Sequence, residues 1–94
     1  MIRVAFTRNL ERHIHCPAME IDGAEKAQIS VRDALERVFA RNASARSYVL
    51  DDQSALRQHM MVYVNGRPIA DRTLLTDAVK DGDEVYVMQA LSGG

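Results

Sequence analysis

Apolar and polar residues alternate at the start of the chain, with the period of two that is typical of a half-buried β-strand. Residues 1–7 follow this pattern, and residues 19–21 repeat it over a shorter length. The stretch between them, residues 8–15, is polar apart from Leu10 and Ile14, which we expect to point inward. We therefore predict two strands of a hairpin with a long connection.

A helical period replaces the alternation after Ser30. Apolar side chains then fall at i, i+3, i+4, i+7 and i+8, which places them on one face of an amphipathic helix. Ser30 is a favourable N-cap, and Asp33 stands where it can complete a capping box. The pattern predicts one main helix, with a core-facing side made of Val31, Ala34, Leu35, Val38 and Phe39.

The segment over residues 43–59 is mixed and polar, and we expect a long loop there with at most a short helical turn. Residues 60–64 are rich in side chains that favour strands, and they run into Asn65-Gly66, a dipeptide typical of tight hairpin turns. Residues 67–69 predict a brief return strand. The proline within it favours a position at the edge of the sheet.

Four apolar residues in the segment 71–80 predict one or two helical turns. Residues 81–83 form a turn, and residues 85–88 predict the final strand. This order, β-β-α-β-β-β, lets the first and last strands lie side by side and parallel, because a long crossover joins them. We expect one domain over residues 1–88 and a flexible tail over residues 89–94.

Composition narrows the class of protein. Hydrophobic residues make up 47% of the 94 residues and charged residues 27%, which is typical of a folded chain rather than a disordered one. Twelve basic against thirteen acidic side chains leave a net charge of −1, so there is no overall positive field to attract nucleic acid. No apolar run suits a membrane span and no export signal is recognisable, so with a single cysteine we expect the cytoplasm.

His13, His15 and Cys16 lie close together in the sequence, a combination that can bind metal. Zinc sites take four ligands, usually as two separated pairs, and the only further histidine, His59, is distant in the chain. Cys16 has no identifiable base to activate it as a nucleophile. We therefore expect no metal site, no bound cofactor and no catalytic residue.

The sequence ends in Gly93-Gly94, which gives the tail an unusual chemistry. Because glycine has no Cβ, such a tail can enter a slot that is too narrow for any side chain. It also presents an unhindered carboxylate, which becomes an electrophile only after activation, for example as an acyl-adenylate.

Four short motifs accompany this tail in the last part of the chain. They are Val62-Tyr63-Val64-Asn65-Gly66, Leu74-Leu75, Asp81-Gly82-Asp83-Glu84-Val85 and Leu91-Ser92-Gly93-Gly94. Together with the element order, they make the chain resemble ubiquitin-like β-grasp proteins, and more closely the prokaryotic MoaD/ThiS-like sulfur carriers. The resemblance implies an α+β fold, with a mixed sheet of four to five strands covered by one main helix.

The resemblance also implies a function. A ubiquitin-activating-type enzyme would use ATP to adenylate the carboxylate of Gly94. A sulfur donor, either a sulfurtransferase or a cysteine desulfurase, would convert the adenylate to a thiocarboxylate. An acceptor synthase in molybdopterin, thiazole, cysteine or related biosynthesis would then take the sulfur. Gly93, Ser92 and Leu91 would present the reacting carboxylate, and the chain itself would be a carrier rather than an enzyme.

The parity of the two best-defined strands predicts a partner surface. If Val62, Val64, Val85 and Val87 face the core, then Met61, Tyr63, Tyr86 and Met88 face away from the helix. Tyrosine and methionine are typical interface residues, because they offer large and adaptable contact areas. We therefore expect these four side chains to form a partner-binding patch.

Two other functions remain open. The chain could be a ubiquitin-like modifier that is joined to lysines through Gly94, or a non-covalent interaction domain whose tail has no chemistry. The long segment over residues 43–59 resembles that of longer carriers and archaeal modifier proteins, so the subfamily, pathway and oligomeric state stay undecided.

Overall fold

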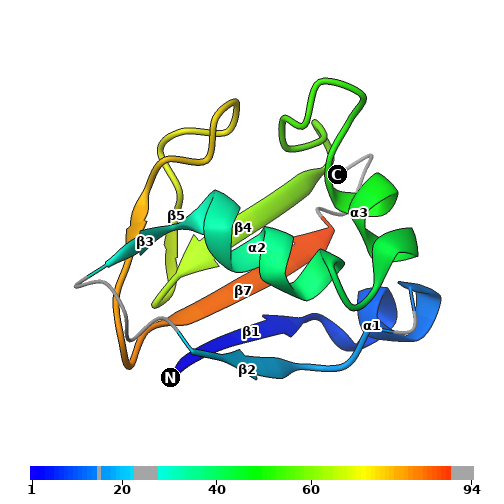
Figure 1. Cartoon of the computed structure of the whole chain (residues 1–94). Coiled ribbons are helices and arrows are strands. Elements are labelled where there is room, and N and C mark those ends of the chain that lie inside the picture. Colours follow the sequence, from blue (N-terminus) through cyan, green and yellow to red (C-terminus); the bar gives the residue numbers. More distant parts are fainter. Residues whose placement is uncertain (15, 23–27, 90–94) are drawn as a thin grey trace.

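Five strands form one mixed sheet in the order β2-β1-β7-β4-β5 (Figure 1). The structure is a computed structural model that describes residues 1–14, 16–22 and 28–89. The strands are β1 (Ile2–Phe6), β2 (Met19–Ile21), β4 (Met60–Val64), β5 (Arg67–Pro68) and β7 (Glu84–Gln89). β1 and β7 pair in parallel and β1 and β2 are antiparallel, which confirms both predicted pairings.

The predicted main helix is α2 (Val31–Phe39), and its cap is formed as expected. Ser30 Oγ accepts a hydrogen bond from the backbone N–H of Asp33 at 3.0 Å, and Asp33 Oδ2 accepts one from the N–H of Ser30 at 3.3 Å. All five predicted core residues of this helix are buried. The capping box therefore fixes where the helix begins, and its apolar face fixes which side meets the sheet.

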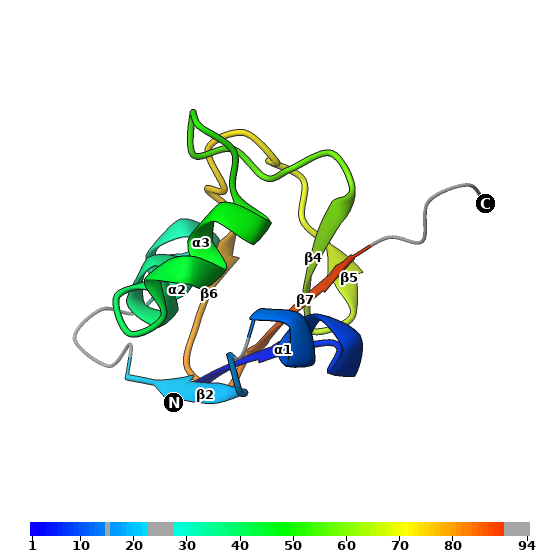
Figure 2. The same ribbon diagram turned by 90° about the vertical axis from the view of Figure 1, so that its right-hand side faces the viewer.

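The core lies between α2 and the sheet. Ile2, Val4 and Phe6 of β1 are all buried, as their alternation predicts. A second helix, α3 (Ala43–Val49), packs beside α2, and both lie on the same side of the sheet (Figure 2). The opposite face of the sheet carries neither of these helices.

The prediction of a polar connection over residues 8–15 is wrong, because Arg8–Ile14 form a helix, α1. Its first turn is closed by a hydrogen bond of 2.7 Å from the N–H of Glu11 to the carbonyl of Thr7, and Leu10 is buried in the core. With only Leu10 and Ile14 as inward anchors in seven residues, periodicity is too weak to reveal such a helix. The figures place α1 at the end of the sheet to which β1 leads (Figures 1 and 2).

The prediction of helical turns over residues 71–80 is also wrong. The described chain there is an irregular loop followed by a short strand, β6 (Ala78–Val79), which pairs with β3 (Ile29–Ser30) in a separate two-stranded sheet. Leu75 has a φ of 53°, a left-handed conformation that cannot continue a helix. The structure therefore contains elements that the predicted order β-β-α-β-β-β lacks, among them the strands β3 and β6.

The segment over residues 43–59 combines α3 with an irregular stretch, so the expected long loop is shorter than predicted. Hydrogen bonds from arginine side chains connect the parts of this region. Arg46 Nε bonds Glu36 Oε1 at 3.0 Å, and Arg57 Nε donates to the carbonyl of Ser47 at 2.7 Å. These bonds hold α3 against α2 and hold the following stretch against α3.

Candidate functional site

The predicted partner-binding patch lies on the face of the sheet that is opposite α2 and α3. In the register of β4 and β7, Met61 is directly across from Met88, and Tyr63 is directly across from Tyr86. Each of the four side chains is half-buried, because close cross-strand neighbours shield one another. We call these four residues the outer patch.

The core side of the same strands confirms the predicted parity. Val62, Val85 and Val87 are fully buried, and Val64 is half-buried and packs against the core at the end of β4. A shift of one residue would have exchanged the two faces, so this register is what places the outer patch on the open side. Its role in binding a partner remains a prediction.

The outer patch continues onto the neighbouring strands. Ala5 of β1 pairs with Tyr86, and Pro68 of β5 pairs with Tyr63. At the other margin, Arg72 Nη1 lies 3.5 Å from the sulfur of Met61. The result is a largely apolar surface that is bordered by the guanidinium of Arg72 beside Met61 and by the Arg3–Glu84 ion pair beyond Ala5 and Tyr86, and it suits contact with a partner protein.

The residues expected to carry the chemistry lie outside the described residues: Leu91, Ser92, Gly93 and Gly94. The structure does fix where the chain comes from. Gln89, the last residue of β7, pairs with Met60 at the start of β4, one position beyond the Met61–Met88 pair. The outer patch therefore lies next to the point at which the described part of the chain ends.

Two of the motifs that carried the resemblance contact each other. The side-chain amide of Asn65 donates to Asp83 Oδ1 at 2.8 Å, and Asn65 Oδ1 accepts from the N–H of Glu84 at 2.9 Å. The backbone N–H of Lys80 and the Asn65 amide lower the pKa of Asp83. Asn65 has a φ of 51°, as a tight hairpin turn requires. These residues lock the β4–β5 turn to the start of β7, which is a structural role.

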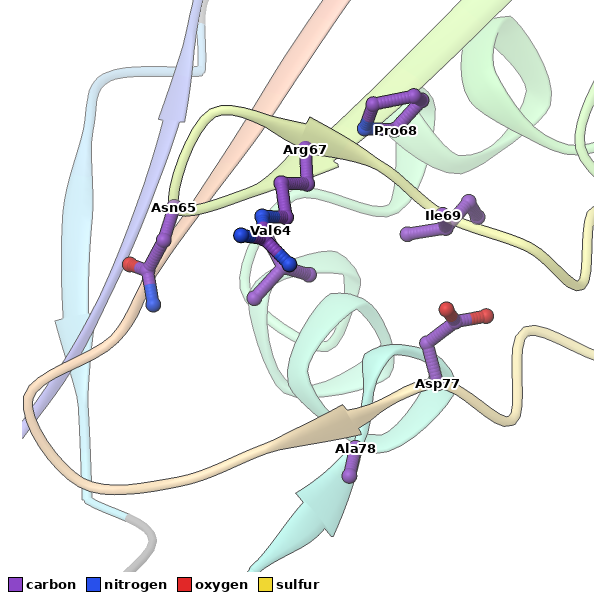
Figure 3. Close-up of a pocket in the computed structure, with 7 residues that line it drawn as sticks. All are labelled: Val64, Asn65, Arg67, Pro68, Ile69, Asp77 and Ala78. Carbon is purple, nitrogen blue, oxygen red and sulfur yellow. The ribbon is translucent and has the colours of Figure 1, made fainter.

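A groove of about 590 Å³ lies between the β4–β5 hairpin and β6 (Figure 3). Val64, Pro68, Ile69 and Ala78 give it apolar walls, and Asn65, Arg67 and Asp77 are its polar residues. The carboxylate of Asp77 accepts hydrogen bonds of 2.9 Å from the N–H groups of Ala70 and Asp71. Because its acid is engaged with backbone, the groove holds no free catalytic pair.

Cys16 is buried in the core, and burial raises the pKa of its thiol. A buried thiol that stays protonated is a poor nucleophile and a poor metal ligand. Within residues 1–14, 16–22 and 28–89, no group of three or more histidine, cysteine, aspartate or glutamate side chains is placed to hold a metal ion. His15 and the side chain of His13 lie outside what the structure describes.

Sequence reasoning missed Leu74 and Arg72. Leu74 was expected on a helix, yet its side chain is 62% exposed at the tip of a loop. The contact of Arg72 with the outer patch depends on a loop that folds back over the start of β4, and no local pattern signals such a contact.

No described helix is long and apolar enough to cross a membrane.

A family model described as the ThiS family matches residues 16–94 of the chain. No curated protein matches it significantly. The family match covers the outer patch, both contacting motifs and the C-terminal glycines.

Several solved structures share the fold. SAMP1 of Haloferax volcanii is 25% identical, with a TM-score of 0.80 and coverage of 99% of this chain and 98% of that one. A chain of the Amycolatopsis orientalis BexX/CysO complex is 23% identical, with a TM-score of 0.78 and full coverage of both chains (100% and 100%). CysO of Mycobacterium tuberculosis is 19% identical, with a TM-score of 0.75 and coverage of 97% and 100%. The chain therefore has the ubiquitin-like β-grasp fold predicted from its sequence.

Proposed function

The chain belongs to the ThiS family, and from this we propose that it is a sulfur carrier whose C-terminal Gly94 is converted to a thiocarboxylate. The family match is the observation that carries the proposal, because it extends through Gly93 and Gly94. The fold supports it: β7 ends beside the outer patch, so a partner that binds the patch is close to the tail.

The proposed chemistry has two steps. A carboxylate oxygen of Gly94 attacks the α-phosphorus of ATP, which forms an acyl-adenylate and releases pyrophosphate. A sulfur nucleophile at the oxidation level of sulfide then attacks the carbonyl carbon. The carbon–sulfur bond forms as AMP leaves, and loss of a proton gives the thiocarboxylate. Glycine at both terminal positions leaves the carbonyl open to attack, because no side chain shields it.

Partner enzymes supply everything that the chain lacks in this proposal. An adenylating enzyme of the ubiquitin-activating type binds ATP. A sulfurtransferase or cysteine desulfurase donates sulfur as a persulfide, which a thiol reduces to the level of sulfide as the S–S bond breaks and the thiol becomes a disulfide. A synthase then accepts the sulfur. One of the similar structures is that of a BexX/CysO complex, which fits a carrier that works through partners. The chain itself binds no cofactor and acts in the cytoplasm as a co-substrate rather than as a catalyst.

Deletion of Gly94 tests the proposal. The rate of pyrophosphate release is measured with ATP and the purified adenylating enzyme of the source organism. The rate with the chain that lacks Gly94 should be at least about 100-fold lower than the rate with the full chain. Equal thermal unfolding of the two proteins is the control for folding. If the shortened chain is as active as the full chain, the proposal is contradicted.

A second candidate is a ubiquitin-like protein modifier, since one similar structure is that of small archaeal modifier protein 1 of Haloferax volcanii. Lys80 is the last site for trypsin in the chain, so conjugation would leave residues 81–94 attached to lysines of target proteins after digestion, whereas a carrier alone leaves no such branched peptide. A purely non-covalent domain would behave differently again. Its partner binding would survive loss of Gly94 and would weaken on replacement of Tyr63 or Tyr86 by alanine.

A further inference from the structure

Charged residues gather at both ends of the sheet. The end at which β7 begins carries several acids: Glu20, Asp22, Asp81, Asp83 and Glu84. The end at which β7 finishes carries arginines on α1 and on the loop beside β4. Two of these acids are paired, Asp81 with the N-terminal amine and Glu84 with Arg3, whereas the arginine side chains of α1 make no bond with a described residue.

Arg72 lies on one side of the end at which β7 finishes. Its Nη2 donates to the carbonyls of Arg57 at 2.8 Å and Gln58 at 3.3 Å, and its Nη1 lies 3.5 Å from the sulfur of Met61. These contacts hold the guanidinium at the start of β4. The carboxylate of the neighbouring Asp71 makes no ion pair with Arg72 and instead accepts hydrogen bonds from the loop residues Thr73, Leu74 and Thr76.

Arg8 and Arg12 form the other side. The N–H of Thr7 donates to the carbonyl of Val87 at 3.0 Å, so α1 starts beside the last residues of β7. Arg8 and Arg12 are one turn apart and share a face of that helix. Both are exposed, and neither makes a hydrogen bond or ion pair with any residue in the described ranges. Glu11, on the same helix, is half-buried.

The side chains of Arg8, Arg12, Arg41 and Arg67 make no bond with a described residue, and of these four only Arg8 and Arg12 lie on α1, beside the last residues of β7. The arginines that bond a carboxylate or a carbonyl within the chain are Arg3, Arg32, Arg37, Arg46, Arg57 and Arg72. The two arginines of α1 have no such structural use, and they sit where the chain leaves the sheet. We call Arg8, Arg12 and Arg72 the cationic collar.

The length of the tail puts the collar at the partner's surface. Five residues follow Gln89, and an extended chain of that length spans at most about 18 Å. For Gly94 to reach a buried adenylation site, Gln89 must come close to the mouth of the partner's channel. The residues that flank Gln89 then lie against the rim of that mouth.

We propose that the cationic collar docks on an acidic rim, formed by aspartate and glutamate side chains, around the channel of the adenylating enzyme that receives the tail. This inference rests on the proposed function and adds the kind of surface that its first partner presents. The arginines of the collar orient the carrier during its approach, with the tail leading, and electrostatic steering of this kind speeds association about 10- to 1,000-fold. The outer patch then provides the apolar contact.

A pair of charge-matched double variants tests the collar. Arg8→Glu/Arg12→Glu reverses the α1 side of the collar. Arg41→Glu/Arg67→Glu reverses two other exposed arginines whose side chains make no bond with a described residue. Both variants change the net charge by the same amount, from −1 to −5. The readout is kcat/KM for the carrier in pyrophosphate release by the purified adenylating enzyme, at about 0.05 M and about 0.5 M salt.

At low salt, we expect the collar variant to lose about tenfold or more in kcat/KM, whereas the control stays within about twofold of wild type. At high salt, the loss should shrink to about twofold, because screening shortens the reach of charges to a few ångströms. Three results would each overturn the inference. The first is a wild-type kcat/KM for the collar variant at low salt, the second is an equal loss of kcat/KM in both variants, and the third is a loss that does not change with salt concentration. If the wild-type chain itself releases no pyrophosphate, the proposed function fails first.

Discussion

Asp71 organises the loop that precedes β6. Its Oδ1 accepts hydrogen bonds from the N–H groups of Thr73 at 3.1 Å and Leu74 at 2.9 Å, and its Oδ2 accepts one from the hydroxyl of Thr76 at 2.6 Å. The hydroxyl of Thr76 and the backbone N–H groups lower the pKa of this carboxyl from 3.8 to about 2. The charged form is therefore the one that the folded loop stabilises.

This shift predicts how the stability of the protein depends on pH. Because the pKa of Asp71 is lower in the folded chain, its contribution is fully present above about pH 4 and is lost as the pH falls through about 2. Asp71→Asn should therefore lower the urea midpoint at pH 7, since its amide faces N–H donors. The difference from wild type should shrink between pH 4 and pH 2.

Asp52→Asn is the matched control, because Asp52 is exposed and makes no hydrogen bond or ion pair with a described residue. It should leave the midpoint almost unchanged at pH 7. A difference between Asp71→Asn and wild type that is constant from pH 7 to pH 2 would show that the carboxylate charge is not what stabilises the loop.

The loop over residues 70–77 acts as an element in its own right, because it closes the N-terminus of α2. The N–H of Val31 donates to the carbonyl of Asp77 at 2.9 Å, and the N–H of Arg32 donates to the carbonyl of Leu75 at 3.0 Å. Arg32 Nε also donates to the carbonyl of Leu74 at 3.0 Å. The loop thus satisfies helix-end donors that would otherwise lack a partner.

Adjacent leucines provide a test of this loop. Leu75 is fully buried and Leu74 is 62% exposed. Leu75→Ala should lower the free energy of unfolding by about 2–5 kcal/mol, because it leaves a cavity in the core. Leu74→Ala should change it by about 0.5 kcal/mol or less. Urea denaturation at pH 7 measures both, and equal losses from the two variants would contradict the conformation of the loop.

The same loop shows where sequence reasoning stops. Leu74, Leu75, Ala78 and Val79 have the spacing of a helical face, so periodicity predicted a helix. The side-chain bonds of Asp71 and the left-handed backbone of Leu75 decide otherwise, and neither is visible in the apolar pattern. The five strands of the main sheet were predicted well, because alternation and the Asn-Gly turn are local signals, but the two-residue strands β3 and β6 were not predicted. The short helices α1 and α3 were not, since they depend on tertiary packing.

At the scale of the whole molecule, the fold brings together segments that are far apart in the sequence. The outer patch comes from β4 and β7, and the collar comes from α1 and the loop before β6. Strand parity was enough to predict which side chains form the outer patch. The collar was not predictable, because its members meet only through the parallel pairing of β1 with β7 and the fold-back of the loop.

The mass of the intact protein purified from its native host tests the central claim most directly. A thiocarboxylate at Gly94 replaces one oxygen by sulfur, so we predict a species about 16 Da heavier than the sequence requires, with the added mass on the C-terminal peptide. An alkylating reagent should label the C-terminal peptide of that species alone, whereas Cys16 can be labelled in every copy of the chain. The account is contradicted if the C-terminal peptide is found only with an unmodified carboxylate while the adenylating enzyme and the sulfur donor are active in the same cells.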